Sequence, residues 1–237
     1  MVIAILLYQQ AYALEVGLFE SAQLTDTAHA ARQGDFYFRP LEQSEYGITD
    51  RVSISTSLLG WATGVPNAET ELQLIDNWGW ALSVTPYFST DYDLTSIRSG
   101  ATFIHSQQYS EDRLNTSVRV GYIGAVPENE LVFSADDFEL GIGLSYDIVS
   151  RAVIHRLRGA ISSGLDWERT SAWNLGYSVN ASLSERTRLE LGVDFGDAGA
   201  FSSAAAFNEL LRESAYGTEL AANPLLPSPS ASLFWVF

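Results

Sequence analysis

The sequence contains no cysteine and no lysine in its 237 residues. The absence of cysteine excludes disulfide bonds and thiolate chemistry. All 13 basic residues are therefore arginines, and 29 acidic residues outnumber them, which gives a formal net charge of −16. A chain this acidic argues against nucleic acid as a partner, because binding phosphates requires a basic surface.

The sequence also lacks an apolar run long enough for a transmembrane helix, which needs about 20 residues. The apolar run at residues 2–8, followed by Ala11-Tyr12-Ala13, is typical of the hydrophobic region and cleavage site of a signal peptide. A basic stretch before the run is missing, so either the true start lies upstream or the segment is not a signal peptide; we favour the first. We predict a signal peptide at residues 1–13 and one domain at residues 14–237, because nothing there is typical of a linker. If this chain crosses a membrane, it crosses with strands.

Apolar and polar residues alternate from Gly34 onward, in segments of about ten residues separated by turn residues. Within residues 171–183, Leu175, Tyr177 and Val179 fall on one strand face, and small polar residues occupy the other. Such alternation, weak in one segment and repeated along the chain, is typical of a membrane β-barrel. The predicted strands are 35–47, 51–61, 69–76, 79–90, 96–108, 113–125, 138–148, 151–164, 171–183, 187–197 and 228–237.

An odd number of strands does not suit a bacterial barrel, which has an even count when both termini lie in the periplasm. Residues 14–23 alternate partly and are the best candidate for one more strand. We therefore predict an all-β fold: a closed antiparallel up-and-down transmembrane β-barrel of twelve strands, with ten as the alternative. A short helix is expected in the last outer loop, at residues 202–215, because strong helix formers dominate there.

Alternation alone does not separate a membrane barrel from a soluble β-sandwich, because only the direction of the apolar face differs. Two features favour the barrel. The polar faces are rich in Gly, Ser and Asn, which fit a confined lumen, and Trp and Tyr recur near segment ends, as an interfacial belt requires. Short turns, predicted to be periplasmic, alternate with longer outer loops; they lie at residues 46–51, 76–79, 110–112, 183–187 and near 150.

Residues 228–237 read Ser-Pro-Ser-Ala-Ser-Leu-Phe-Trp-Val-Phe and place Leu233, Trp235 and Phe237 on one strand face. This stretch resembles the C-terminal strand of bacterial outer-membrane β-barrels, in which a terminal Phe is an assembly signal for the barrel-assembly machinery. The resemblance implies the outer membrane of a Gram-negative bacterium, with lipid, lipopolysaccharide and that machinery as partners. Residues 34–41 with 46–51 look like the opening of poorly characterised porin-like families, which implies solute passage without naming a substrate.

Alternation directs seven arginines and seven carboxylates into the lumen, so we expect an interior close to neutral. Unlike charges in a narrow lumen are expected to pair, because an unpaired buried charge is costly. The candidate lumen-lining charges are Arg98, Arg119, Arg156, Arg158, Arg188, Glu71, Glu139, Asp147, Glu190 and Asp194, with Arg39, Arg113, Glu45 and Glu69 beside them.

Two functions are compatible with this interior. The leading hypothesis is a passive pore or transporter for small solutes. The alternative is a structural or interaction barrel, with a salt-bridged, filled lumen and acidic surface loops. A balanced lumen favours extensive pairing, whereas a clean aqueous pore tends to show a bias of sign.

Catalysis is the least favoured hypothesis. Outer-membrane phospholipases and lipid A deacylases carry His-x-Ser, and none of His29, His105 and His155 belongs to that motif. His105 and Ser106 are adjacent, so their side chains point to opposite faces of a strand. No spacing marks a protease resembling the omptins, and the acidic pairs lack the EF-hand spacing for calcium. We therefore expect neither an enzyme, such as a lipid hydrolase or protease, nor a metal site or cofactor.

Overall fold

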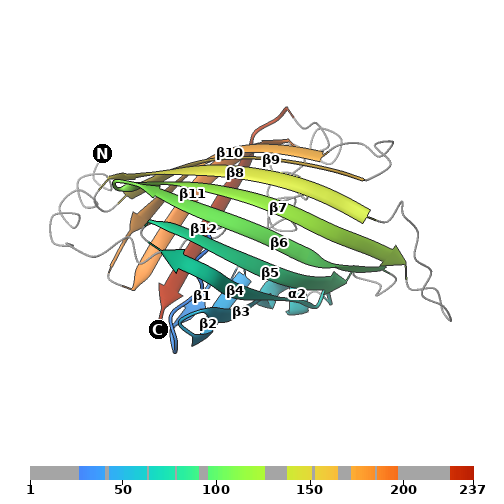
Figure 1. Ribbon diagram of the computed structural model, residues 1–237. Coiled ribbons are helices and arrows are strands. Elements are labelled where there is room, and N and C mark those ends of the chain that lie inside the picture. Colours follow the sequence, from blue (N-terminus) through green and yellow to red (C-terminus); the bar gives the residue numbers. More distant parts are fainter. Residues whose placement is uncertain are drawn as a thin grey trace.

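The computed structural model of the protein describes residues 27–40, 43–62, 64–77, 79–90, 96–125, 138–150, 153–164, 172–184, 186–196 and 225–237. Within these ranges twelve antiparallel strands form one closed barrel, as predicted (Figure 1). Each strand pairs with its neighbours along the chain, and β1 pairs with β12 to close the wall. The strands are β1 (Phe36–Phe38), β2 (Gln43–Thr49), β3 (Val52–Ser57), β4 (Asn67–Asn77), β5 (Trp80–Thr90), β6 (Ser96–Tyr109), β7 (Asp112–Ala125), β8 (Phe138–Ser150), β9 (Val153–Gly164), β10 (Ala172–Ser182), β11 (Thr187–Gly196) and β12 (Ser228–Val236).

The twelfth strand arises from a part of the chain that we predicted to form only one strand. Residues 35–47 form two strands, β1 and β2, and the prediction of a single strand there is wrong. Pro40 follows β1, and a proline supplies no backbone N–H to a strand ladder. Residues 14–23 lie outside the described residues, as do the predicted signal peptide at 1–13 and the predicted helix at 202–215.

A short helix, α2 (Leu58–Ala62), replaces the end of the strand predicted at residues 51–61. Ser57 is the last residue of β3, and its Oγ accepts a hydrogen bond from the backbone N–H of Gly60 at 3.0 Å. This is the geometry of a helix N-cap, which satisfies a backbone donor that the first turn leaves free. Ser57, the last of the alternating serines of β3, therefore caps α2, and the strand ends there. No helix within the described ranges is long and apolar enough to cross a membrane.

The apolar face of the strands points away from the barrel. Leu175 is 58% exposed and Ile142 is 56% exposed, whereas Ser178, on the opposite face, is 1% exposed. A soluble sandwich would bury the apolar face between two sheets and expose the polar one. The facing observed here is the inverse, and it is the facing of a barrel that presents apolar side chains to lipid and polar ones to its lumen.

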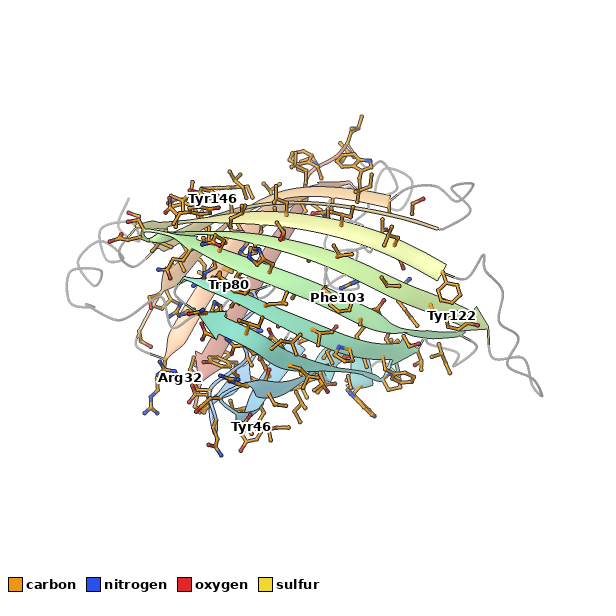
Figure 2. All side chains as sticks on the ribbon, viewed as in Figure 1. Arg32, Tyr46, Trp80, Phe103, Tyr122 and Tyr146 are labelled. Carbon is orange, nitrogen blue, oxygen red and sulfur yellow. The ribbon has the colours of Figure 1, made fainter. Side chains whose placement is uncertain are left out.

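Aromatic side chains mark both rims of the wall. Figure 2 shows Trp80 and Tyr146 toward one end of the barrel, Phe103 partway along it and Tyr122 toward the other end. The rings of Tyr122 and Phe138 lie 5.5 Å apart at that second end. Aromatic side chains toward both ends of the wall are what an interfacial belt requires where a barrel meets the two membrane surfaces, and Phe103 lies between these ends.

The short connections all leave from one end of the barrel, here called the short-turn end. They join β2 to β3, β4 to β5, β6 to β7, β8 to β9 and β10 to β11. The connections at the other end, the loop end, are mostly longer, and much of the predicted acidic loop sequence lies outside the described residues. The observed alternation of short and long connections matches the one predicted from the turn residues.

The barrel closes through a small contact between β1 and β12. Only two register positions join these strands in the described wall, whereas β6 and β7 pair along their full 14 residues. Backbone hydrogen bonds between Phe36 and Phe237, at 3.2 and 3.0 Å, extend the closure toward the short-turn end. The ring of Phe36 stacks on that of Phe237 at 6.3 Å, and Phe38 contacts Trp235 at 5.9 Å. Closure therefore depends on a local aromatic cluster.

Candidate functional site: the lumen

The lumen is the only interior that a barrel of this kind offers, and its wall carries the predicted charges. Alternation along each strand places them on the same face as the buried serines and asparagines, for example Ser106, Ser145 and Ser178. The structure positions on this inner face Arg39, Arg98, Arg113, Arg119, Arg156, Arg158, Arg188, Glu45, Glu69, Glu71, Glu139, Asp147, Glu190 and Asp194.

Burial divides these charges into two groups. Those near the short turns are almost fully enclosed: Arg113, Asp147, Arg156 and Arg188 are 1–4% exposed. Most of those farther toward the loop end retain contact with solvent: Arg98 is exposed and Arg119, Arg158, Glu71 and Glu139 are partly exposed, but Asp194 is only 4% exposed. Glu190, three residues after the start of β11, is partly exposed although it lies near a short turn. The lumen is therefore packed near the short-turn end and more open toward the loop end.

A hydrogen-bonded ion pair is the centre of the packed half. Asp147 accepts hydrogen bonds from Arg156, at 2.6 Å from Nε and 3.1 Å from Nη2. Asn115 donates a third, at 3.1 Å, and also donates to Ser145 Oγ at 3.1 Å. Its own Oδ1 accepts from Ser106 Oγ at 2.7 Å. These bonds cross β9, β8, β7 and β6 and compensate both buried charges, as a buried pair requires.

The network continues into a stretch that belongs to no strand, residues 27–33, here called the inner segment. The backbone N–H of Ala28 donates to Ser106 Oγ at 2.8 Å. The side chain of Ala28 is fully buried against Ala81 of β5 and Ile104 of β6. Ala31 is fully buried as well, and it packs against Tyr37 of β1. The inner segment thus lies inside the barrel, between opposite parts of its wall.

A second anchor fixes the inner segment to β2. The backbone N–H of Ala31 donates to Glu45 Oε1 at 3.1 Å, and Ser53 Oγ donates to the same oxygen at 2.5 Å. Gly47 is also required here, because a Cβ at that position would overlap the carbonyl oxygen of Arg32. Gly34, at a φ of 88°, then turns the chain out of the lumen and toward β1.

The one histidine of the inner segment adds no charge at neutral pH. Burial, reinforced by the nearby guanidinium of Arg113, lowers the pKa of His29 to about 4, and the carboxylate of Asp76 opposes the shift. Nδ1 of His29 lies 3.5 Å from Nε2 of Gln73 on β4. A neutral imidazole lets the inner segment lie next to Arg113 without charge repulsion.

In the more open half, the polar side chains lie along the wall. Arg158 of β9 forms a bidentate pair with Asp194 of β11, at 2.9 and 2.7 Å. The guanidinium passes over Gly176 of β10, where a Cβ would collide with both partners. Glycine therefore allows this pair to span one strand of the wall without projecting into the bore.

A similar arrangement holds the next arginine. Arg119 donates to Thr102 Oγ1 at 3.2 Å, and its guanidinium lies 5.0 Å from the ring centroid of Tyr87. The hydroxyl end of Tyr87 lies over Gly100 and Gly121, where a Cβ would contact it. Tyr87 therefore packs flat on the wall of β6 and β7, and the guanidinium of Arg119 stacks on its ring.

These contacts leave a cavity of about 90 Å³ on the inner wall. A cavity needs about 10–15 Å³ to hold one water, so this one has room for several waters or a small solute. Its polar lining offers both hydrogen-bond donors and acceptors, contributed by Thr102, Asn115, Arg119, Arg158, Asn174 and Asp194.

The histidines are not arranged for nucleophilic catalysis. His105 contacts the ring of Trp80 on the outer face, and His155 Nδ1 bonds to the Tyr177 hydroxyl at 2.7 Å, also on the outer face. His29 has Gln73 as its polar neighbour. Within the part of the chain that the structure describes, no group of three or more His, Asp or Glu side chains is placed to hold a metal ion.

No protein-family model and no curated protein matches this sequence at a significant level. Among solved structures, the barrel is similar to one described as a NanC porin, with a TM-score of 0.51 and 10% sequence identity. The similarity covers 85% of this chain and 96% of that one. A chain described as a bacterial polysaccharide outer membrane secretin aligns with a TM-score of 0.45 and 10% identity, over 82% of this chain and 67% of that one. At these identities the first comparison establishes likeness of fold, and the second carries no argument.

Proposed function

We propose that the protein is a channel of the bacterial outer membrane that passes small polar solutes passively and has no enzymatic activity. One observation carries the proposal: two arginines of the loop half, Arg119 and Arg158, are held along the wall by neighbouring side chains. Arg158 of β9 pairs with Asp194 of β11 across the intervening β10, and Arg119 lies against Tyr87. Side chains held in this way line a bore without bridging it. The likeness of fold to a porin supports the same function.

The outer surface supports the location. The outward face is apolar, and aromatic side chains lie at both rims, as lipid and the two interfaces require. In this proposal outer-membrane lipid and lipopolysaccharide surround the wall, the short-turn end faces the periplasm, and residues 228–237 are recognised by the barrel-assembly machinery. Small solutes are the partners inside the bore.

The competing function is a structural or interaction barrel with a filled lumen. The packed half, with the Arg156–Asp147 pair at its centre, favours that alternative at the short-turn end. The cavity and the partly exposed Arg158 side chain do not, because a filled interior would enclose both. Conductance separates the two functions.

The test uses the full chain, refolded and inserted into planar lipid bilayers. Its folded state is checked first by the shift in gel mobility between unheated and boiled samples. A channel is expected to give discrete current steps in potassium chloride, whereas a filled structural barrel gives none. If the folded chain and the variants described below all fail to conduct, the channel function is wrong.

One substitution in the loop half is expected to shift the ion selectivity of the channel. Asp194→Asn keeps a hydrogen-bond acceptor beside Arg158 and removes its counter-charge. A unit charge at 4 Å in water-like surroundings acts with about 1 kcal/mol, so we expect the ratio of chloride to potassium permeability to rise roughly fivefold. The reversal potential under a salt gradient measures this ratio.

The control for this prediction is Glu111→Gln, which removes the same charge from the exposed turn between β6 and β7. It is expected to leave the reversal potential unchanged. An equal shift in both variants, or in neither, would show that ions do not pass beside Arg158.

A further inference from the structure

We infer that the inner segment is a gate: it closes the short-turn end of the lumen and leaves its position before solute crosses. The inference rests on the proposed channel function and assigns that channel its means of regulation. Its basis is a group of contacts between residues 27–33 and strands that lie far apart around the wall. We call the wall residues that receive the segment the dock: Glu45, Gly47, Ala81, Ile104 and Ser106.

The inner segment crosses the bore. At one end Ala31 bonds to Glu45 on β2, and at the other end Ala28 bonds to Ser106 on β6. In the closed order of strands, β2 and β6 are separated by three strands on one side and by seven on the other. A chain of a few residues that contacts both walls therefore spans the lumen.

Buried side chains fill the space on either side of the inner segment. Beyond Ser106, the Arg156–Asp147 pair occupies the lumen at β8 and β9. Toward β1 and β12, the guanidinium of Arg39 lies 5.2 Å from the ring centroid of Phe234, and both side chains are buried. Together with the segment, these groups form a packed layer at the short-turn end.

The wall is shaped to receive the inner segment. The inner face is otherwise largely polar, yet Ala81 and Ile104 face inward where Ala28 lies and bury its methyl group. On β2, the residue facing the segment is Gly47, which leaves room for the backbone of Arg32. The backbone of the inner segment covers these apolar and glycine positions.

The contacts also allow the inner segment to leave. It precedes β1, so no strand ladder is broken when it moves. Three of its bonds to the barrel run from backbone N–H groups to side-chain oxygens: Ala28 to Ser106, Ala31 to Glu45, and Gln33 to Asp50 in the β2–β3 turn. Its methyl groups are small, His29 is neutral at neutral pH, and Gly34 supplies a pivot of positive φ. Figure 2 shows Arg32 at this end of the barrel.

The decisive experiment is a reversible tether. Because the chain has no cysteine, Ala28→Cys with Ser106→Cys introduces one defined thiol pair where the Ala28 nitrogen and the Ser106 oxygen lie 2.8 Å apart. We expect the oxidised variant to lose its current steps. Reduction with dithiothreitol should restore the steps and increase the open time at least tenfold. The two single-cysteine variants serve as controls and should not respond to dithiothreitol.

A second variant displaces the inner segment without a tether. Gly47→Ala places a methyl group where the Arg32 carbonyl lies, so the segment cannot seat. We expect its open time to exceed that of the unaltered chain at least tenfold. Gly159→Ala is the matched control, because its added methyl faces outward and makes only ordinary contacts with Leu175 and Asn174. It should leave the open time unchanged.

The outcomes distinguish the gate from the channel. Equal conductance in the oxidised and reduced tether, with a chain that conducts, overturns the gate and leaves the channel standing. If the unaltered chain, the reduced double-cysteine variant and Gly47→Ala all fold and none of them conducts, the channel and the gate are both wrong. If Gly47→Ala does not fold, the tether alone decides. Loss of current on oxidation and its return on reduction, absent from both single variants, establishes the gate.

Discussion

Replacing Asp147 with alanine is expected to destabilise the barrel by about 3–5 kcal/mol, because it leaves the buried guanidinium of Arg156 without its counter-charge. The substitution also removes an acceptor of Asn115 and so interrupts the network that reaches Ser106. Urea unfolding in lipid vesicles, followed by tryptophan fluorescence and gel mobility, measures the loss.

The matched control is Asp194→Ala. Its partner Arg158 has a side chain that is 24% exposed, against 2% for Arg156, so water can solvate the guanidinium left behind. We expect a smaller loss than for Asp147→Ala, because the guanidinium of Arg158 keeps contact with water. Equal losses in the two variants would mean that the short-turn half of the lumen is as wet as the loop half.

A double substitution separates burial from charge. Asp147→Leu with Arg156→Met replaces the ion pair with apolar side chains of similar size, and such exchanges are often neutral or stabilising. We expect this variant to recover most of the stability lost by Asp147→Ala. Failure to recover would show that the hydrogen bonds of Asn115, and not the compensation of charge, hold this half together.

The sequence was sufficient to predict the wall because alternation is a local property. Leu175, Tyr177 and Val179 point to one side whatever their neighbours are, and the repeated pattern gave the facing and most strand positions. The inward face of the charges follows from the same rule. Which charge pairs with which does not, because it depends on register: Arg158 reaches Asp194 by passing over Gly176 on an intervening strand. Gly176 is the sequence feature that could have indicated this pair, because only glycine leaves room for the two side chains to meet above it.

The departures from prediction have local causes. In β3, Ser53, Ser55 and Ser57 continue one alternation, yet Ser57 acts as a helix cap, a role that becomes visible only when Gly60 bonds to it. The break between β1 and β2 is marked by Pro40, which the alternation around it obscured.

The inner segment could not be predicted from periodicity. The stretch Ala28-His29-Ala30-Ala31 has small side chains and no strand or helix period that reveals a position in a lumen. Its position depends on residues far away in the chain: Ala81 and Ile104 form one contact and Gly47 another. The inward-facing Ile104 in an otherwise polar strand face could have indicated a covering segment, but Ile154 of β9 faces inward in the same way, so the feature does not say where a segment lies or which one it is.

Removal of Phe237 is expected to reduce the yield of folded barrel at least tenfold, because this residue extends the small closure between β1 and β12. The deletion removes two backbone hydrogen bonds to Phe36 and the stacking of the two rings. At about 0.5–1.5 kcal/mol for each hydrogen bond and a similar amount for the aromatic pair, the loss is about 2–4 kcal/mol. Heat-modifiable gel mobility after refolding into detergent measures closure directly.

Phe237→Leu is the matched variant, since it keeps both backbone bonds and loses only the ring contact. Refolded in detergent, it is expected to form several-fold more barrel than the deletion. In cells, recognition of an aromatic side chain by the assembly machinery would make Phe237→Leu nearly as defective as the deletion, whereas closure alone would leave it close to the unaltered chain. Normal yield of the deletion in both settings would show that Phe36 and Phe237 are not needed to close the wall, and that the contact of Phe38 with Trp235 is sufficient.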